Sequence, residues 1–260
     1  MKIFLSALEA TPASKWGDLD KNRDLARYFV EEGIKFKWNL MSYFYIRKKK
    51  YELACFIRDH SEAILIDSGA HSFQFGKKVD FLEYTKEYAE FIKKFDRPNV
   101  LGYFEMDIEN VIGYDKVLEL RKILEAVSDK IIPVWHPLRG IQEYEKMCKE
   151  YSGKIVAIGG FRGTDIKDEQ FLMFLKVARK YGCKVHCLGM TRPKVLDKVP
   201  FDFTDSSSWT QQGIFGKIGK KSVTKEFSKT SRNIIWRENY KIGQQMQEHY
   251  YKKWRKECKD

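Results

Sequence analysis

The chain has 260 residues, of which 43% are hydrophobic and 15% aromatic, which suits one folded domain spanning 1–260 and excludes a chain disordered by composition. Lysine and arginine total 48 against 36 aspartate and glutamate, and the net charge of +12 favours a polyanionic partner such as nucleic acid. Because no apolar run is long enough for a membrane helix or a signal peptide, we expect a cytoplasmic protein without a membrane partner.

The cysteines are scattered, with no regular spacing apart from one pair four residues apart. They are Cys55, Cys148, Cys183, Cys187 and Cys258. This pattern is typical of neither a disulfide framework nor a zinc site, so we expect reduced thiols and no metal. Cys183 and Cys187 crowd around His186 in a predicted strand, where packing in the core is the simplest explanation.

Eight short apolar segments bounded by turn residues are predicted to form strands. They are residues 2–8, 38–44, 63–66, 100–106, 131–135, 155–158, 184–188 and 201–204. Most of them are continuously apolar, as expected for parallel strands that are covered on both faces.

Segments with helical periodicity lie between these strands. They are residues 24–32, 47–60, 80–95, 114–127 and 169–181. Gly33 and Gly182 follow two of them, at the position where glycine commonly ends a helix. The alternation of strands and helices, without an internal repeat, predicts a (β/α)8 TIM barrel. A doubly wound open sheet is the alternative, although such sheets usually have fewer strands.

The segment 214–260 is the most basic part of the chain, since its 13 lysines and arginines against five acidic residues contribute +8 of the net charge. Residues 233–257 have helical spacing and are predicted to form the eighth barrel helix as a basic C-terminal extension. The glycine-containing loop 213–232 leaves the last strand on the catalytic side. Its Lys217, Lys220 and Lys221 are therefore candidates for contacts with nucleic-acid phosphates.

Three aspartates follow apolar runs at the end of the barrel where active sites lie. Asp67 follows the third predicted strand, Asp107 the fourth and Asp205 the eighth. One aspartate at such a position could cap the next helix. Three that converge are costly unless they share a ligand or a proton, so we interpret the set as functional.

These residue types suit chemistry at a sugar carbon. Two carboxylates can run a displacement at an anomeric carbon, one as the nucleophile and the other as acid and then base. A third carboxylate can accept hydrogen bonds from N1–H and the amine of guanine. Gly159 and Gly160, which follow the sixth strand, would let a ligand approach the backbone. Base exchange on a guanosine and hydrolysis by a retaining glycosidase both fit, although the positive charge makes the glycosidase unattractive.

The strand-end motifs resemble those of the tRNA-guanine transglycosylase superfamily, including its short phage and bacterial members that put 7-deazaguanine bases into DNA. Residues 67–74 resemble its Asp-Ser-Gly-Gly-Phe-Gln signature, and residues 156–161 resemble its Ala-Ile-Gly-Gly-Leu run. Residues 184–190 resemble its Leu-Met-Gly type turn, and residues 202–206 its Asp-Met-Phe-Asp-Cys run. The resemblance extends from about residue 63 to residue 208.

The resemblance implies an enzyme, a pentosyltransferase that exchanges guanine through a covalent glycosyl-aspartate and needs no cofactor. It implies that Asp205 is the nucleophile, that Asp67 is the general acid and base, and that Asp107 reads the purine. The implied substrate contacts are Ser68, Phe73, His136, Gly159 and Gly160.

Two of these contacts depart from the family pattern. Extra residues in the signature mean that either His71 or Phe73 could stack on the base, and Phe73 is favoured for its larger apolar face. His136 stands where the family usually has glutamine, and its imidazole can hydrogen-bond a base edge or anchor the loop before Pro137.

The family's cysteine-rich zinc motif has no counterpart among the five cysteines, which favours DNA over tRNA as the substrate. The incoming base would be a 7-deazaguanine such as 7-cyano-7-deazaguanine, and a phage-encoded enzyme would act in the host cytoplasm. Since the attacked carbon is inaccessible inside a duplex, the target nucleotide must be flipped out or single-stranded. The alternatives are the same exchange on tRNA, or a barrel that binds nucleic acid without altering it.

Overall fold

The computed structural model describes residues 1–10, 24–47, 50–73, 79–160, 166–222 and 232–258. In these residues, parallel strands form one sheet in the order β5-β4-β3-β2-β1-β9-β8-β7-β6. The strands are β1 (Lys2–Ser6), β2 (Phe36–Ser42), β3 (Ser61–Asp67), β4 (Val100–Phe104), β5 (Ile131–Ile132), β6 (Val134–Trp135), β7 (Ile155–Ile158), β8 (Lys184–Cys187) and β9 (Phe203–Ser206). Because Pro133 alone separates β5 from β6, the two ends of this order join and the sheet closes. The predicted (β/α)8 TIM barrel is confirmed.

The fifth predicted strand is divided at Pro133, since proline has no N–H to donate to a strand ladder. Glu105, just after β4, bridges the break. Its N–H donates to the carbonyl of Ile132 (3.0 Å) and its carboxylate accepts from the N–H of Val134 (2.6 Å). Arg121 donates two hydrogen bonds to the same carboxylate, at 2.6 and 3.1 Å, and both side chains are buried. A buried ion pair therefore sits at the closure of the barrel.

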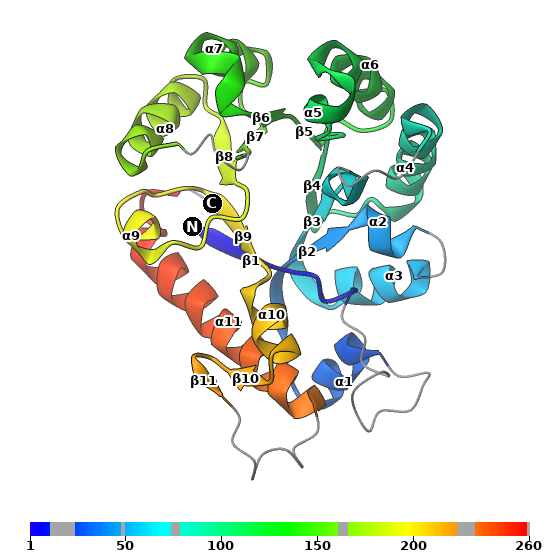
Figure 1. The fold of residues 1–260 in the computed structure, drawn as a ribbon, viewed down its shortest axis with the longest axis vertical. Helices are drawn as coiled ribbons and strands as arrows, with labels where there is room; N and C mark the ends of the chain where they lie inside the picture. Colours follow the sequence, from blue (N-terminus) through cyan, green and yellow to red (C-terminus); the bar gives the residue numbers. More distant parts are fainter. Residues whose placement is uncertain (11–23, 48–49, 74–78, 161–165, 223–231, 259–260) are drawn as a thin grey trace.

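Helices alternate with the strands and surround the sheet (Figure 1). The longer ones are α1 (Leu25–Glu31), α3 (Tyr51–Asp59), α4 (Phe81–Phe95), α6 (Tyr114–Glu125), α7 (Gly140–Glu150), α8 (Phe171–Lys180) and α11 (Arg232–Trp254). Short helices follow several strands, namely α2 (Tyr43–Ile46), η1 (Ala70–Phe73), α5 (Glu109–Ile112), η2 (Pro137–Arg139), η3 (Asp168–Gln170), α9 (Pro193–Leu196) and α10 (Ser208–Ile214). No helix in the described part of the chain combines the length and the hydrophobicity needed to cross a membrane.

The predicted helices are present with small shifts of their ends, and two differences have local causes. α7 is absent from the predicted set, although Tyr144, Met147 and Cys148 form its buried face at helical spacing. β2 ends at Ser42, because Tyr43 already begins the helical turn of α2. The boundary matters for function, since it brings Ser42 to the carboxyl end of the sheet.

The core lies on both sides of the sheet. Side chains such as Phe4, Leu65 and Phe104 fill the inside of the barrel, whereas Leu5 and Ile64 on the same strands face the helices. Burial on both faces explains the continuously apolar runs in the sequence.

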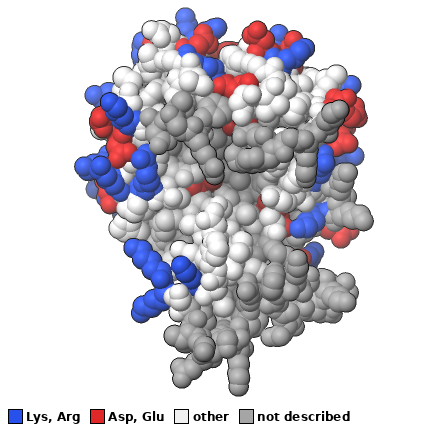
Figure 2. Space-filling view, in the orientation of Figure 1, with Lys and Arg blue, Asp and Glu red and all other residues white. Residues whose placement is uncertain are grey.

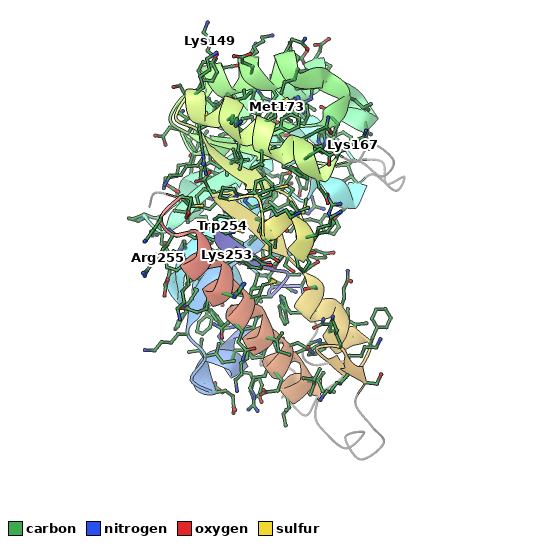
Figure 3. The ribbon with its side chains drawn as sticks, turned by 90° about the vertical axis from the view of Figure 1, so that its left-hand side faces the viewer. Lys149, Lys167, Met173, Lys253, Trp254 and Arg255 are labelled. Atoms are coloured by element: carbon green, nitrogen blue, oxygen red, sulfur yellow. The ribbon has the colours of Figure 1, made fainter. Side chains whose placement is uncertain are left out.

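The basic C-terminal segment is part of the barrel wall. Gln247 on α11 donates to the carbonyls of Ile3 (2.7 Å) and Trp38 (2.8 Å), which joins the helix to β1 and β2. Figure 3 shows the far end of α11, where the indole of Trp254 donates to the carbonyl of Leu196 at 2.8 Å. α11 is the predicted eighth barrel helix.

Part of the predicted loop 213–232 is an antiparallel hairpin of β10 (Lys217–Ile218) and β11 (Lys221–Ser222). Asn239 on α11 holds it, since its side chain accepts from the N–H of Gly219 (2.9 Å) and donates to the carbonyl of Lys217 (2.7 Å). Residues 223–231 of the predicted loop lie outside the described residues.

Replacing Arg121 by Met should destabilise the fold by about 3–5 kcal/mol, because Glu105 would remain buried without a partner. Lys116→Met is the matched control on the same helix, since Lys116 pairs with Glu119 on the surface and should cost less than about 1 kcal/mol. Denaturant unfolding of both variants measures the difference. Equal losses would show that the buried pair does not hold the barrel closure.

Candidate active site

Asp67, Asp107 and Asp205 lie at the carboxyl ends of β3, β4 and β9. Burial, and then the negative charges of Asp107 and Asp205, raise the pKa of Asp67 from its ordinary 3.8 to about 6. The barrel therefore brings the three carboxylates predicted from the sequence within electrostatic reach of one another.

Asp205 accepts three hydrogen bonds. Nε2 of His186 donates to Oδ1 (3.0 Å), as does the N–H of Gly189 (2.8 Å), and the hydroxyl of Ser6 donates to Oδ2 (3.3 Å). The side chain of Asp205 is 16% exposed, so it is held from behind and still reaches the surface of the site. Donors to both oxygens hold the carboxylate in one orientation, as a carboxylate nucleophile needs.

His186 fixes the direction of Asp205 from inside the barrel. Its side chain is fully buried, with the rings of Phe4 and Phe104 at centroid distances of 6.3 and 5.0 Å. Nδ1 is buried and has no hydrogen-bond partner among the described residues. The expected packing of Cys187 beside it is confirmed, but His186 also reaches the site.

Asp67 is held by the turn that follows β3. Its Oδ2 accepts from the N–H of Gly69 (2.9 Å) and from the hydroxyl of Ser42 (3.2 Å), its register partner on β2. Gly69 has φ +77°, and a Cβ there would lie 2.4 Å from Cβ of Phe44, so only glycine fits. These donors partly offset the effect of burial, but the proton remains favoured on Asp67 at mildly acidic pH.

Asp107 forms a pair with His136. Nε2 of His136 donates to Oδ1 of Asp107 at 2.5 Å, and His136 is 2% exposed. A Cβ on Gly159 would lie 2.5 Å from the His136 ring, so the ring packs directly on that glycine. The structure thus places His136 behind Asp107, where it orients the carboxylate, and not at an open base edge as expected.

A cavity of about 310 Å³ opens between the ends of β7 and β8, and one of its lining residues, Gly189, donates its N–H to Asp205. Its lining includes Gly159, Gly160, Leu188, Gly189 and Met190. Gly159 is buried and its N–H donates to the carbonyl of Trp135 (2.8 Å), so this amide is already used within the sheet. Gly160 is exposed, with open space where a Cβ would lie, and it remains a candidate for contact with a base.

Two of the expected substrate contacts are turned inward. Ser68 is fully buried, and its hydroxyl accepts from the N–H of Ala70. Phe73 is 3% exposed and packs edge-on against Phe44 and Tyr84. Neither side chain can touch a base in this conformation, because the core covers both. The side chain of His71, the other candidate for stacking, lies outside the described residues.

The three candidate phosphate-binding lysines lie together on the hairpin. Lys217, Lys220 and Lys221 are exposed, and within the described residues none of them forms an ion pair. Figure 2 shows basic side chains at the lower left, over the place of β10 and β11 in Figure 1. Their charge is therefore available to a polyanion.

Ser6, Ser42 and His186 are site residues that the sequence reasoning missed. Ser6 and Ser42 end β1 and β2, so the rule that pointed to Asp67 would have found them with correct strand ends. His186 is a polar residue inside an apolar strand, a signal that could equally mean a packed histidine. The hydrogen bond between His186 and Asp205 shows that this histidine belongs to the site.

All five cysteines lie in the described part of the chain and are free thiols. Within the described residues, no group of three or more His, Cys, Asp and Glu side chains is arranged to hold a metal ion.

No protein-family model matches the sequence, and no curated protein matches it. A putative fructose-1,6-biphosphate aldolase from Coccidioides immitis is similar in structure, with a TM-score of 0.55 at 10% identity, over 96% of this chain and 91% of that one. A mutant tryptophan synthase alpha-subunit from Pyrococcus furiosus has a TM-score of 0.51 at 13% identity, over 93% of this chain and 98% of its own. These similarities show the shared barrel fold, and function has to be argued from the site.

Asp67→Asn should stabilise the protein at pH 8 by at most about 3 kcal/mol, and the gain should shrink toward pH 4.5. The folded state binds a proton on Asp67 more tightly than the unfolded chain, so the wild type loses stability as pH rises from about 3.8 to about 6. Asp80→Asn, at the exposed N-cap of α4, is the matched control. Denaturant unfolding at both pH values measures the difference, and a gain independent of pH would contradict the raised pKa.

Proposed function

We propose that this protein is an enzyme that exchanges guanine in DNA for a 7-deazaguanine base, such as 7-cyano-7-deazaguanine, through a covalent glycosyl-aspartate. The observation that carries the proposal is the contrast between two carboxylates of one site. Asp205 has hydrogen-bond donors on both oxygens, whereas burial and like charges favour the proton on Asp67. Displacement at an anomeric carbon requires this division into nucleophile and acid.

In the first step, an oxygen of Asp205 attacks C1′ of the target nucleotide while the bond from C1′ to guanine N9 breaks. Asp67 donates its proton to the departing base, which leaves as neutral guanine. His186, Ser6 and the N–H of Gly189 hold the Asp205 carboxylate in one orientation, so little reorganisation precedes the attack.

In the second step, the incoming base loses its N9 proton to the ionised Asp67. N9 then attacks C1′, the bond to Asp205 breaks, and the carboxylate returns to its starting form. Each step inverts the configuration at C1′, so the two together preserve it. The exchange involves no net oxidation or reduction, and two aspartates supply its chemistry: Asp67 as acid and then base, and Asp205 as nucleophile.

Asp107 supports recognition of a purine in this proposal. His136 holds one of its oxygens, and among the described residues Oδ2 has no hydrogen-bond partner. A carboxylate with a free oxygen can accept from N1–H and the exocyclic amine of guanine. The cavity lined by Gly160, Gly189 and Met190 offers space for a base, and its Gly189 contacts Asp205.

The nucleic-acid part of the proposal is supported by the exposed lysines of the hairpin and by the motifs that resemble the transglycosylase superfamily. The missing cysteine-rich motif favours DNA over tRNA. A flipped or single-stranded target would expose C1′ to Asp205 at a cost of a few kcal/mol, which phosphate contacts can offset.

Asp205→Ala should reduce exchange by a factor of about 10³ or more, because the covalent route is lost. The assay measures entry of radiolabelled guanine into genomic DNA and, separately, into bulk tRNA, followed by mass spectrometry of nucleosides after incubation with 7-cyano-7-deazaguanine. Asp202→Asn is the matched control, since Asp202 is a carboxylate close in sequence that accepts from the N–H of Val185 at 2.8 Å. Label in tRNA alone would show that tRNA is the substrate. Binding of nucleic acid without exchange would support a barrel that binds nucleic acid without altering it.

Replacing Lys217, Lys220 and Lys221 by Ala should weaken DNA binding about equally for all sequences. It should also reduce the magnitude of the negative slope of log affinity against log salt by roughly 0.7–0.9 for each phosphate that the variant no longer binds. The control replaces three exposed lysines, Lys116, Lys146 and Lys149, with the same change of charge. Lys149 lies at the far end of the molecule from the hairpin (Figure 3). An unaltered slope in the hairpin variant would remove the hairpin from the phosphate path.

A further inference from the structure

Glu9 is a buried carboxylate beside the site. It follows β1, is 1% exposed, and its Oε1 accepts from the backbone N–H of Ser42 at 2.9 Å. Its Oε2 is buried and has no hydrogen-bond partner among the described residues. Lys50 donates to the backbone carbonyl of Glu9 (2.7 Å) and not to its carboxylate. Burying a carboxylate with one oxygen unengaged is costly, so the position calls for an explanation beyond packing.

Ser42 joins Glu9 to Asp67. Its backbone N–H donates to Glu9, and its hydroxyl donates to Oδ2 of Asp67 at 3.2 Å. The two donors belong to one residue at the end of β2, directly opposite Asp67 in the strand register. The two carboxyl groups are therefore held in a fixed relation, and a movement of Glu9 would move the donor of Asp67.

The charges around the pair favour a retained proton. Burial raises the pKa of Glu9 to about 7, against the opposing effects of the backbone N–H groups of Ser42 and of Glu9 itself and of the charge of Lys50. The negative charge of Asp67 adds a smaller effect in the same direction as burial. The pKa of Asp67 is raised to about 6 by burial and by the other two aspartates. Two neighbouring acids thus titrate in one pH range, where the charge on one makes ionisation of the other harder.

We propose that Glu9 is a positioning residue for Asp67: it holds Ser42 against Asp67, and the ionisation of each carboxyl group affects that of the other. The inference rests on the proposed function only for the use of the proton on Asp67, which would pass to the departing base. The coupling of the two acids is a property of the folded protein alone.

The coupling can be measured without any substrate, by carbon-13 NMR titration of protein labelled at the side-chain carboxyl carbons. Loss of a signal in Asp67→Asn or in Glu9→Gln assigns each group. Glu9→Gln should lower the pKa of Asp67 by about one unit, since a negative neighbour is removed. Ser42→Ala should raise it, because a donor to the ionised form is removed. Opposite shifts from two adjacent changes would not arise from general loosening of the site.

A reciprocal measurement keeps the test open if Glu9→Gln does not fold. Coupling between two sites is equal in both directions, so Asp67→Asn should lower the pKa of Glu9 by the same amount. Asp202→Asn removes another buried carboxylate and should leave both values unchanged. An unchanged pKa of Asp67 in folded Glu9→Gln, or of Glu9 in Asp67→Asn, would overturn the proposal.

The activity assay separates this inference from the proposed function. If base exchange occurs, Glu9→Gln should move the alkaline limb of its pH-rate profile to lower pH, because Asp67 would lose its proton earlier. Coupled acids without base exchange would contradict the proposed function and leave the role of Glu9 intact. Base exchange with uncoupled acids would support the proposed function and contradict the role of Glu9.

Discussion

The hydrogen bonds of Glu105 across the break at Pro133 are the constraint on which both the barrel and its site depend. They tie the end of β4 to the start of β6, where the sheet has no ladder of its own. Asp107 comes two residues after Glu105, and His136 comes two residues after Val134. Closing the sheet at this point therefore sets the distance between Asp107 and His136. A carboxylate that closes the barrel and one that belongs to the candidate site lie in a single strand end, and only their partners tell them apart.

The site brings three like charges together in a buried place, and hydrogen-bond donors are distributed unequally among the carboxylates. Asp205 accepts from backbone and side-chain donors on both oxygens, while Asp67 has fewer donors relative to its burial. Burial of like charges is unfavourable for folding, and it favours the proton on Asp67, as the proposed role of a general acid requires. The three carboxylates therefore destabilise the folded state at the place where they meet.

The fold could be predicted from the sequence because strands buried on both faces appear as continuous apolar runs, and the carboxylates because each follows such a run. The position of Ser42 at a strand end could not be predicted. The apolar run predicts a strand that is two residues too long, because the turn of α2 is set by packing of Tyr43. Phe73 looks suited to stacking in a linear motif, but its burial depends on Phe44 and Tyr84, which come from other elements. Local sequence indicates where the strands are, but it places their ends only to within about two residues and does not reveal tertiary neighbours.

The place of α11 has a consequence for the order in which the molecule can assemble. β1 pairs on one side with β9, with Lys2 opposite Phe203, and Gln247 near the end of the chain donates to Ile3. Within this chain, β1 therefore emerges from the ribosome well before the strand that pairs with it and the helix that covers it. Such distant contacts slow folding, and an incomplete chain exposes an apolar edge. Ring closure accordingly has to wait until β9 and α11 have been made, and β1 lacks these partners until then.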